Sequence, residues 1–474
     1  MSNTLSSMMR KKPIQPERTQ LEPTIGLFQL TMLGVGATIG TGIFVVLNDV
    51  VPQAGPAVIF AFILAAITAA LTALSYAEMA SCIPASGSSY SYAYATLGEY
   101  LAYLVAWCLL LEYGVSAAAI AVGSGEYLNK FLEITLGFKF PDSLSNVPAA
   151  GGVVNLPSMV IVALCCVLLL RGSKESTVVN TIMVVVKLFI LCMFIGIAIT
   201  AFNSDNMQPF APHGYTGVWL ATATVFFSFI GIDAISTAGE EVKNPKRNLP
   251  LAIILALCIV TGFYILISLT AIGAQPAAEF EGQKAGLAQI LQNVTGATWP
   301  ATIFALGAVI STFSVILIVL YGQTRILYAM GRDGMIPSFF ERISPIKNAP
   351  TNNILLVCII VMLAAGFTPA DVLFDLTSIG TLVAFSAVSI GVIILRNTHP
   401  ELPRSFKVPF YPATPLLAIG FCVYVLSGLP PVTFFYFAIW IGIATTTYFV
   451  FSIRHSRLNP VNMPEVVRYP VEKH

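Results

Sequence analysis

Charged side chains are scarce in this chain of 474 residues, of which only 10% are Asp, Glu, Lys or Arg. A soluble globular domain carries about 25% charged residues. Hydrophobic residues make up 56% of the chain, and its mean hydropathy is +0.82. This balance excludes an ordinary soluble protein and predicts an all-α integral membrane protein.

Histidine is also rare, and the four histidines fall in expected loops or at the ends of the chain. A histidine-based active site within the membrane is therefore not expected. The eight cysteines lie in or beside expected membrane spans, none of them in an expected outer loop, and their spacing matches no metal motif. We therefore expect no disulfide, no metal, no cofactor and no enzymatic activity.

Several motifs are missing. The chain has no Gly-x-x-x-x-Gly-Lys-Ser/Thr run to cradle a phosphate, which sets nucleotide hydrolysis aside. The net charge is +1 and no basic patch with interleaved aromatics occurs, so no nucleic-acid partner is expected. The polar, basic first 23 residues lack the apolar core and small-residue cleavage site of a signal peptide.

Long apolar runs are what the chain has instead. A helix needs about 20 apolar residues to cross a bilayer, and Ala57 to Ala77 form such a run without a charge. We expect twelve spans, at residues 27–50, 56–81, 96–130, 156–171, 177–202, 217–239, 248–274, 299–331, 352–367, 371–396, 412–428 and 431–454.

Lysine and arginine indicate the orientation, because they gather in cytoplasmic loops. With a cytoplasmic N-terminus, three basic residues fall outside, Lys130, Lys139 and Lys284, and Lys187 falls within a span. All the others fall on the cytoplasmic side. We therefore expect a multi-pass protein of the cell membrane with cytoplasmic tails at residues 1–25 and 456–474.

Glycine interrupts the first expected span, with four glycines in the nine residues 34–42. Unpaired backbone groups are costly in lipid, so irregular chain is tolerated there only where protein or a polar cavity covers it. The sixth span carries a matching interruption at residues 227–233. Two broken helices at corresponding positions are typical of secondary transporters with a binding site near the midplane. Close helix packing through small residues is the weaker alternative.

Spans 1–5 and 6–10 read as two repeats, each opening with a discontinuous helix. An odd number of spans inverts the second repeat, giving a 5+5 inverted repeat plus two peripheral helices. The expected divisions are 26–202, 203–396 and 397–455. Between spans 7 and 8, Ala285–Leu291 is either a short amphipathic helix over the outer vestibule or a solvated connector.

Four runs resemble the amino acid–polyamine–organocation superfamily, and within it the bacterial relatives of the cationic amino acid transporter family. They are Gly36–Phe44, Phe227–Asp233, Glu240–Pro245 and Gly322–Arg325, and the resemblance covers nearly all of residues 25–455. It implies a leucine-transporter-like fold and transport of amino acids. It also allows a lipid or a small single-span partner in a groove, although no residue here argues for either.

A free amino acid carries a carboxylate and an ammonium. The backbone N–H groups around Thr41 and Gly42, where the first span resumes, lie at the positive end of a half-helix and suit the carboxylate. Backbone carbonyls near the breaks suit the ammonium, and the resemblance implies the same assignment. The expected substrate-binding residues are Thr38, Ile39, Gly40, Thr41, Gly42, Phe227, Ser228 and Ile230, with Val115, Ser116, Ser311 and Thr312 as candidates for side-chain selectivity.

Lys187 is a charge deep in the fifth span, where ionisable residues are functional by default. It is either a proton-coupling switch or a structural lysine bonded to broken-helix carbonyls. The resemblance places it where sodium-coupled transporters of this fold bind an ion, which implies sodium independence. Glu112 and Asp233 are the other deep carboxylates, and either could exchange a proton with Lys187. Asp375 reads equally as solvated or functional.

These observations predict an alternating-access transporter of free L-amino acids in the lipid bilayer, with a proton as the coupling ion. Small and medium neutral amino acids are favoured, and cationic ones stay open. The resemblance implies that Phe227 is an aromatic lid over the substrate. The alternatives are an amino acid exchanger without net proton coupling and a non-transporting amino acid sensor, against which the short tails argue.

Overall fold

The computed structural model describes residues 7–13, 25–83, 87–170, 177–237, 242–344 and 350–459, without the side chains of residues 41, 177–180 and 237. Within these ranges the chain is helical and forms no strand, and an isolated bridge pairs Ile25 with Val242. The predicted all-α class is confirmed. Part of the Glu240–Pro245 run and most of both tails lie outside the described residues.

The described residues of the first half of the chain form a series of helices. They are α2 (Leu27–Thr38), α3 (Thr41–Ala54), α4 (Val58–Cys82), α5 (Ser88–Thr96), α6 (Glu99–Leu136), α7 (Asp142–Ser145), α8 (Leu156–Leu170) and α9 (Thr177–Ala198).

The described residues of the second half are helical as well. Its elements are α10 (Gly214–Phe226), η5 (Phe227–Phe229), α11 (Ala234–Thr237), α12 (Pro245–Ala274), α13 (Gly286–Thr295), α14 (Trp299–Arg332), α15 (Thr351–Phe367), α16 (Ala370–Thr398), α17 (Ala413–Leu426), α18 (Pro431–Thr447), a π-helical turn (Tyr448–Ser452) and α19 (Ile453–His455). The stretch left open between helix and connector is helix α13.

Within the described ranges, eight helical segments are long and apolar enough to cross a membrane by length and composition. Four shorter apolar helices, α2, α8, α15 and α17, lie at other expected spans. An integral membrane protein with several spans follows from these segments.

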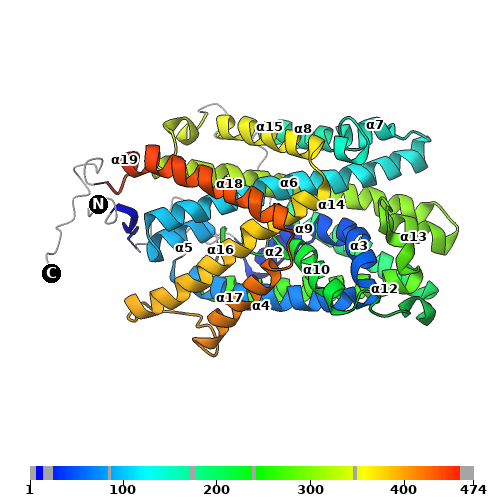
Figure 1. Cartoon of the computed structure of the whole chain (residues 1–474), viewed down its shortest axis with the longest axis horizontal. Coiled ribbons are helices and arrows are strands. Elements are labelled where there is room, and N and C mark those ends of the chain that lie inside the picture. The colour runs from blue at the N-terminus through cyan, green and yellow to red at the C-terminus, as the bar shows by residue number, and fades with distance from the viewer. Residues whose placement is uncertain are drawn as a thin grey trace.

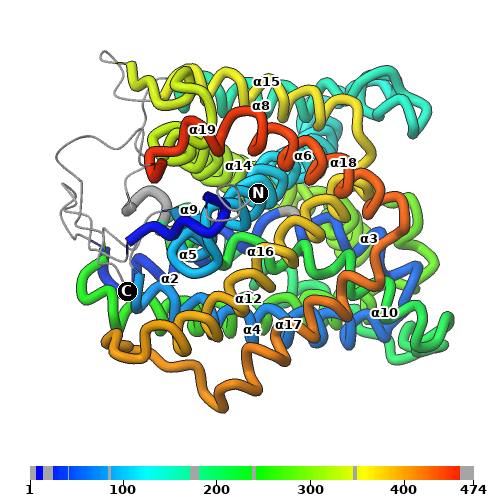
Figure 2. The backbone as a smooth tube through the Cα atoms, turned by 60° about the vertical axis from the view of Figure 1, so that its left-hand side comes forward, coloured from blue at the N-terminus to red at the C-terminus, as the bar shows by residue number. Residues whose placement is uncertain are grey.

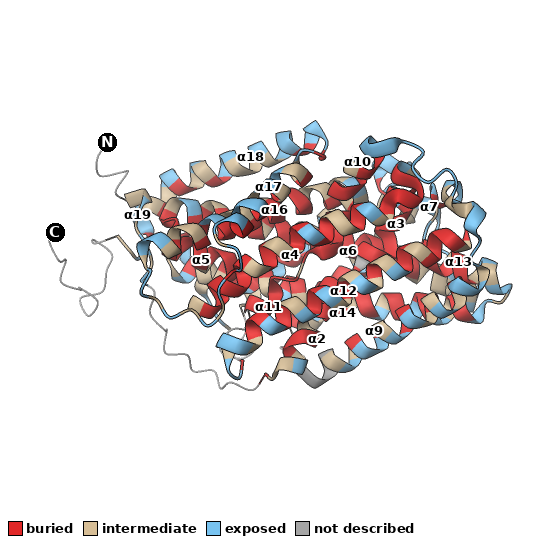
Figure 3. Cartoon of the chain, turned by 90° about the horizontal axis from the view of Figure 1, so that it is seen from below, coloured by how far each residue is buried: buried red, intermediate tan, exposed pale blue. Residues whose placement is uncertain are grey.

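Burial separates central helices from peripheral ones. In the apolar window of α6, 83% of the residues are buried, whereas the corresponding share is 11% in the segment that contains α18 (Figure 3). α6 packs along α14, α16 and α8, so it lies at the centre of the bundle. The long hydrophobic side chains exposed on α9 and α18, such as Phe189 and Phe435, suit contact with lipid.

The two ends of the bundle differ (Figures 1 and 2). The described N-terminal residues, α5 and α19 lie at one end, here the α5 end, and α7 and α13 lie at the other, here the α13 end. The expected spans 56–81 and 96–130 left the residues between them out of the bundle, yet α5 forms there. The reason is packing: Tyr90, Tyr92 and Tyr94 are all buried, so a polar-looking segment folds into the bundle, and Gly98 with φ +97° separates it from α6.

One buried ion-pair network ties α4 to the region that follows α16. Glu78 is 1% exposed and accepts hydrogen bonds from Arg396 at 2.8 and 2.6 Å. The Val408 backbone N–H donates to the same carboxylate at 2.7 Å, and Arg404 lies 3.4 Å from it. A buried carboxylate is stable only with such partners, so this network fixes the two segments to each other.

Candidate functional site

The first helix of the bundle is interrupted between α2 and α3. α2 ends at Thr38, and Gly40 adopts φ −119° and ψ −140° before α3 begins at Thr41. The first N–H groups of a helix have no intrahelical acceptor, so those at the start of α3 point into the break. The positive end of the α3 dipole lies at the same place.

A second interruption follows α10. The chain passes through η5 and a turn at Ile230–Asp233 before α11 starts at Ala234. Gly231 has φ +97°, a conformation that L side chains rarely adopt. This turn releases carbonyl groups near Phe227, Ser228 and Ile230 from regular helical pairing.

The two breaks touch each other. A methyl group added at Gly42 would lie 2.4 Å from the Cα atom of Ser228, and one added at Gly231 would lie 2.7 Å from the carbonyl oxygen of Ala37. Each break therefore supplies one glycine that lets it approach the backbone of the other. The two predicted breaks therefore lie against each other.

Tyr264 of α12 bridges the two breaks. Its hydroxyl lies 3.0 Å from the carbonyl oxygen of Thr38 and 2.7 Å from that of Ser228, and the side chain is fully buried. The Thr38 carbonyl also accepts from the Gly40 N–H at 2.8 Å. The single hydroxyl proton is therefore shared between one carbonyl of each break, which couples the two breaks through one side chain.

Lys187 of α9 reaches the first break from the side. Its ammonium donates to the carbonyl of Gly36 at 2.9 Å and to that of Ile39 at 2.6 Å, and the residue is 2% exposed. These carbonyls belong to the last turn of α2, where a positive charge complements the helix dipole. In this arrangement Lys187 stabilises the broken end of α2.

Glu112 of α6 and Asp233 form a separate acidic pair, and each is 1% exposed. They are close enough to repel each other electrostatically. Asp233 accepts a hydrogen bond from the Tyr113 hydroxyl at 3.0 Å. No hydrogen bond joins Glu112 to Lys187 in the described part of the chain.

The residues expected to set side-chain selectivity are tied less directly to the two breaks. Gly40 faces Val315 of α14 and Ile120 of α6, whose neighbours one turn away include Thr312 and Ser116. The Thr312 hydroxyl lies 2.8 Å from that of Ser124, and Ser116 donates to the Tyr113 carbonyl at 3.1 Å. Ser311 is buried and Val115 is half-buried. The contacts described for these residues do not bring them to the breaks.

Phe227 lies at the second break, with its ring centroid 4.7 Å from that of Phe374 on α16. Thr41 begins α3, but its side chain lies outside the described atoms. Asp375, one residue after Phe374, interacts electrostatically with Asp371. Within the described ranges, no group of three metal-ligating side chains occurs.

Sequence reasoning missed Tyr264 and Tyr113. A signal existed, since a tyrosine inside an apolar span must find a partner for its hydroxyl. Tyr264 stands in such a run, and Tyr113 directly follows Glu112. The pattern alone does not name the partner, because Tyr264 reaches Thr38 across 226 positions of the chain.

Comparisons with known proteins agree on one family. A family model described as "Amino acid permease" matches residues 25–453. The chain is similar to a methylthioribose transporter of Bacillus subtilis (43% identity over 96% of this chain and 100% of that protein) and to the branched-chain amino acid permease BcaP of the same organism (42% over 96% and 99%). It is also similar to the vacuolar cationic amino acid transporter 4 of Arabidopsis thaliana, at 33% identity over 84% of this chain and 68% of that protein.

Proposed function

The chain belongs to the amino acid permease family, and from that premise we propose that it is a sodium-independent secondary transporter of L-amino acids driven by a proton gradient. Membership of this family, with relatives named as permeases and transporters, makes the protein a membrane transporter rather than an enzyme.

The observation that carries the proposal is the contact between the two breaks. The start of α3 offers N–H groups and a positive dipole end to a carboxylate. The turn at residues 227–230 offers carbonyls to an ammonium, next to the positions where Gly42 and Gly231 let the two backbones come close to each other. A free amino acid carries both charges on one carbon, so it complements the two sides at once.

The proposed architecture is twelve spans arranged as a 5+5 inverted repeat (26–202 and 203–396) plus two peripheral helices, with both termini and the α5 end in the cytoplasm. The support is the pair of breaks, one in each half, and the lipid-facing exposure of α18. Alternating access then means that α2 with α11 and α3 with α10 open the site to opposite sides in turn.

We assign proton coupling to the set of Lys187, Asp233 and Glu112. Lys187 is bonded to the first break, and Asp233 lies at the second, so protonation at either place changes a charge beside moving backbone. The hydrogen bonds of Lys187 suit a fixed structural charge equally well. Variants of each of the three residues are therefore needed to distinguish proton coupling from structural support.

Branched-chain and small neutral amino acids are the proposed substrates, because a relative named for branched-chain amino acids is 42% identical over nearly the whole chain. Methylthioribose is a second candidate, since the relative named for it is 43% identical. That molecule has neither carboxylate nor ammonium, so it would gain nothing from the charge arrangement of the breaks.

The test is uptake into liposomes that hold the purified protein, without sodium and with an inward proton gradient. Labelled leucine, alanine and arginine are compared, and each is repeated with unlabelled amino acid inside. Accumulation into empty liposomes is expected. Uptake only into preloaded liposomes would establish exchange, and unlabelled methylthioribose that blocks leucine uptake would favour the second candidate. Binding of an amino acid without any uptake would favour a non-transporting amino acid sensor.

A further inference from the structure

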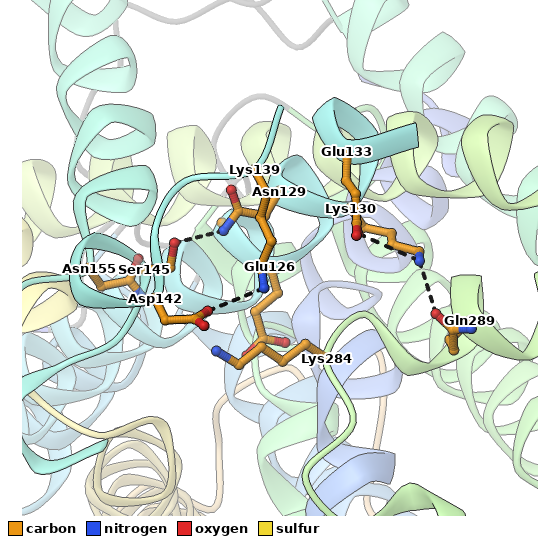
Figure 4. Close-up of a pocket in the computed structure, with 11 residues that line it drawn as sticks. Glu126, Asn129, Lys130, Glu133, Lys139, Asp142, Ser145, Asn155, Lys284 and Gln289 are labelled. Carbon is orange, nitrogen blue, oxygen red and sulfur yellow. Dashed lines mark hydrogen bonds and ion pairs between the residues drawn. The ribbon is translucent and has the colours of Figure 1, made fainter. Parts of the chain in front are cut away.

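A second charged cavity lies at the α13 end, away from the breaks. Its volume is about 220 Å³, and three lysines and three acids line it: Lys130, Lys139, Lys284, Glu126, Glu133 and Asp142. They come from the end of α6, from the segment around α7 and from the loop before α13 (Figure 4). All three lysines that the charge pattern places outside the cell therefore converge on one cavity.

Two opposite charges in this cavity are held apart. Glu126 and Lys284 attract each other electrostatically, yet no carboxylate oxygen of the described residues lies within 4.0 Å of the Lys284 ammonium. Lys284 instead donates to the side chain of Asn146. The buried oxygen Oε2 of Glu126 has no hydrogen-bond partner in the described part of the chain. A ligand with both a cation and an anion would satisfy both groups.

The remaining charges of the cavity are already paired and leave it without an excess of either sign. Lys130 lies 3.8 Å from Glu133 and 2.9 Å from the amide oxygen of Gln289, and Lys139 lies 3.2 Å from Asp142. Three lysines disfavour a metal cation, and three carboxylates disfavour a multiply charged anion. A zwitterion meets neither penalty.

We propose that this cavity is a second binding site, specific for the zwitterionic head group of an α-amino acid. The ammonium binds Glu126 and the carboxylate binds Lys284. The site lies outside the breaks, and its ligand class rests on the proposed function, because an amino acid transporter meets its substrate at this end first.

The cavity is connected to the first break through α13. The Ala285 backbone N–H interacts with the Glu126 carboxyl, and α13 begins at the next residue. A methyl group added at Gly286 would lie 2.2 Å from the side-chain oxygen of Asn48 on α3. Ligand that holds Glu126 and Lys284 together therefore holds α13 against α3, the half-helix that resumes after the break.

The experiment measures the stoichiometry of labelled L-alanine bound to the purified full chain by equilibrium dialysis. The wild type is expected to bind two molecules per chain. Glu126→Gln, which keeps the shape of the side chain, is expected to lose one of them, and Gly42→Leu is expected to lose the other. Propionate and ethylamine, which carry one of the two charges each, should compete far less than glycine does.

The control is Glu281→Gln, an exposed acid of the same loop that does not line the cavity; it should bind as the wild type. Equal stoichiometry in Glu126→Gln and wild type overturns the second site, and so does a Gly42→Leu protein that folds but binds nothing. Stoichiometry unchanged in Gly42→Leu contradicts the proposed break site instead. If Gly42→Leu does not fold, the comparison of Glu126→Gln with wild type decides alone.

Discussion

At the scale of single residues, the contact between the two breaks depends on glycines that have no side chain as much as on side chains that bind. Gly42 and Gly231 each leave room for the backbone of the opposite break. Tyr264 then ties the two breaks together with one hydroxyl. Each of these contacts is sensitive to a change of a single atom.

Gly42→Ala tests the close approach. The added methyl group meets the backbone of Ser228 at 2.4 Å, and overpacking of this kind costs about 1–3 kcal/mol. Because the strain falls on the site itself, uptake is expected to drop about tenfold or more in the liposome assay while the protein stays folded. The matched control is Gly262→Ala in α12, where an added methyl group meets nothing within 4 Å. Equal uptake by the two variants would remove the site from Gly42.

Tyr264→Phe tests the bridge. It deletes the hydroxyl, whose one proton is shared between two buried carbonyl oxygens, without changing the ring, and the loss is expected to cost about 1–3 kcal/mol. The apparent Tm in detergent should fall, and so should uptake, because the two breaks lose their common anchor. Tyr436→Phe is the control, since Tyr436 is 44% exposed on α18. A Tyr264→Phe protein with unchanged Tm would contradict the bridge.

At the scale of helices, polar side chains join elements that the chain order separates widely. Glu78 of α4 binds Arg396 of α16, Lys187 of α9 binds the end of α2, and Thr312 of α14 binds Ser124 of α6. Because lipid offers no competing hydrogen bonds, such links can specify which helices are neighbours.

Glu78→Gln should destabilise the protein strongly. It removes the negative charge that two arginines share, and breaking a buried pair costs about 3–5 kcal/mol. The comparison is Glu341→Gln, whose pair with Arg457 is largely exposed and is expected to contribute less than about 1 kcal/mol. Thermal unfolding in detergent should separate the two variants clearly, and equal Tm values would contradict the role of the network.

The variant Lys187→Ala distinguishes a role of Lys187 in proton coupling from a structural role. If Lys187 carries the coupled proton, the variant should lose the stimulation of uptake by an inward proton gradient but keep exchange into preloaded liposomes. Asp233→Asn is measured beside it, and Lys246→Ala, an exposed lysine near the start of α12, serves as the control. Stimulation that persists in Lys187→Ala would leave a structural role, consistent with its bonds to Gly36 and Ile39.

At the scale of the whole molecule, the described N-terminal residues bind across the α5 end. Lys12 forms an ion pair with Asp333 at 3.6 Å and Arg10 forms one with Glu99 at 3.7 Å. These ion pairs hold the N-terminal residues against the α5 end. The α13 end instead contains the charged cavity lined by Lys130, Lys139 and Lys284. The proposed orientation makes the first end cytoplasmic and the second external.

Single cysteines in a cysteine-free variant test this orientation. Lys284→Cys should react with a membrane-impermeant maleimide on intact cells, whereas His455→Cys in α19 should react only after the membrane is opened. Replacing the native cysteines breaks no disulfide, because all eight are free thiols. The reverse labelling pattern would invert the proposed topology.

The sequence sufficed for features that depend on local composition. Four glycines in residues 34–42 predicted an interruption there, and α2 ends and α3 begins inside that run. Scarcity of charge predicted the all-α membrane class. The sequence could not predict which side chains far apart in the chain bind each other, such as Glu78 and Arg396, which are 318 positions apart. Nor could it show that the tyrosines of α5 would be buried, because no periodicity marks that segment.

The contact between Gly42 and Ser228 also limits how substrate preference can diverge within this scaffold. A larger residue at position 42 is blocked by main-chain atoms, which no rotamer change can move aside. In the proposed site, a new specificity must therefore arise from side chains around the breaks, while the residues proposed to bind the amino acid head group stay fixed. Laboratory evolution toward new substrates should accordingly leave position 42 untouched.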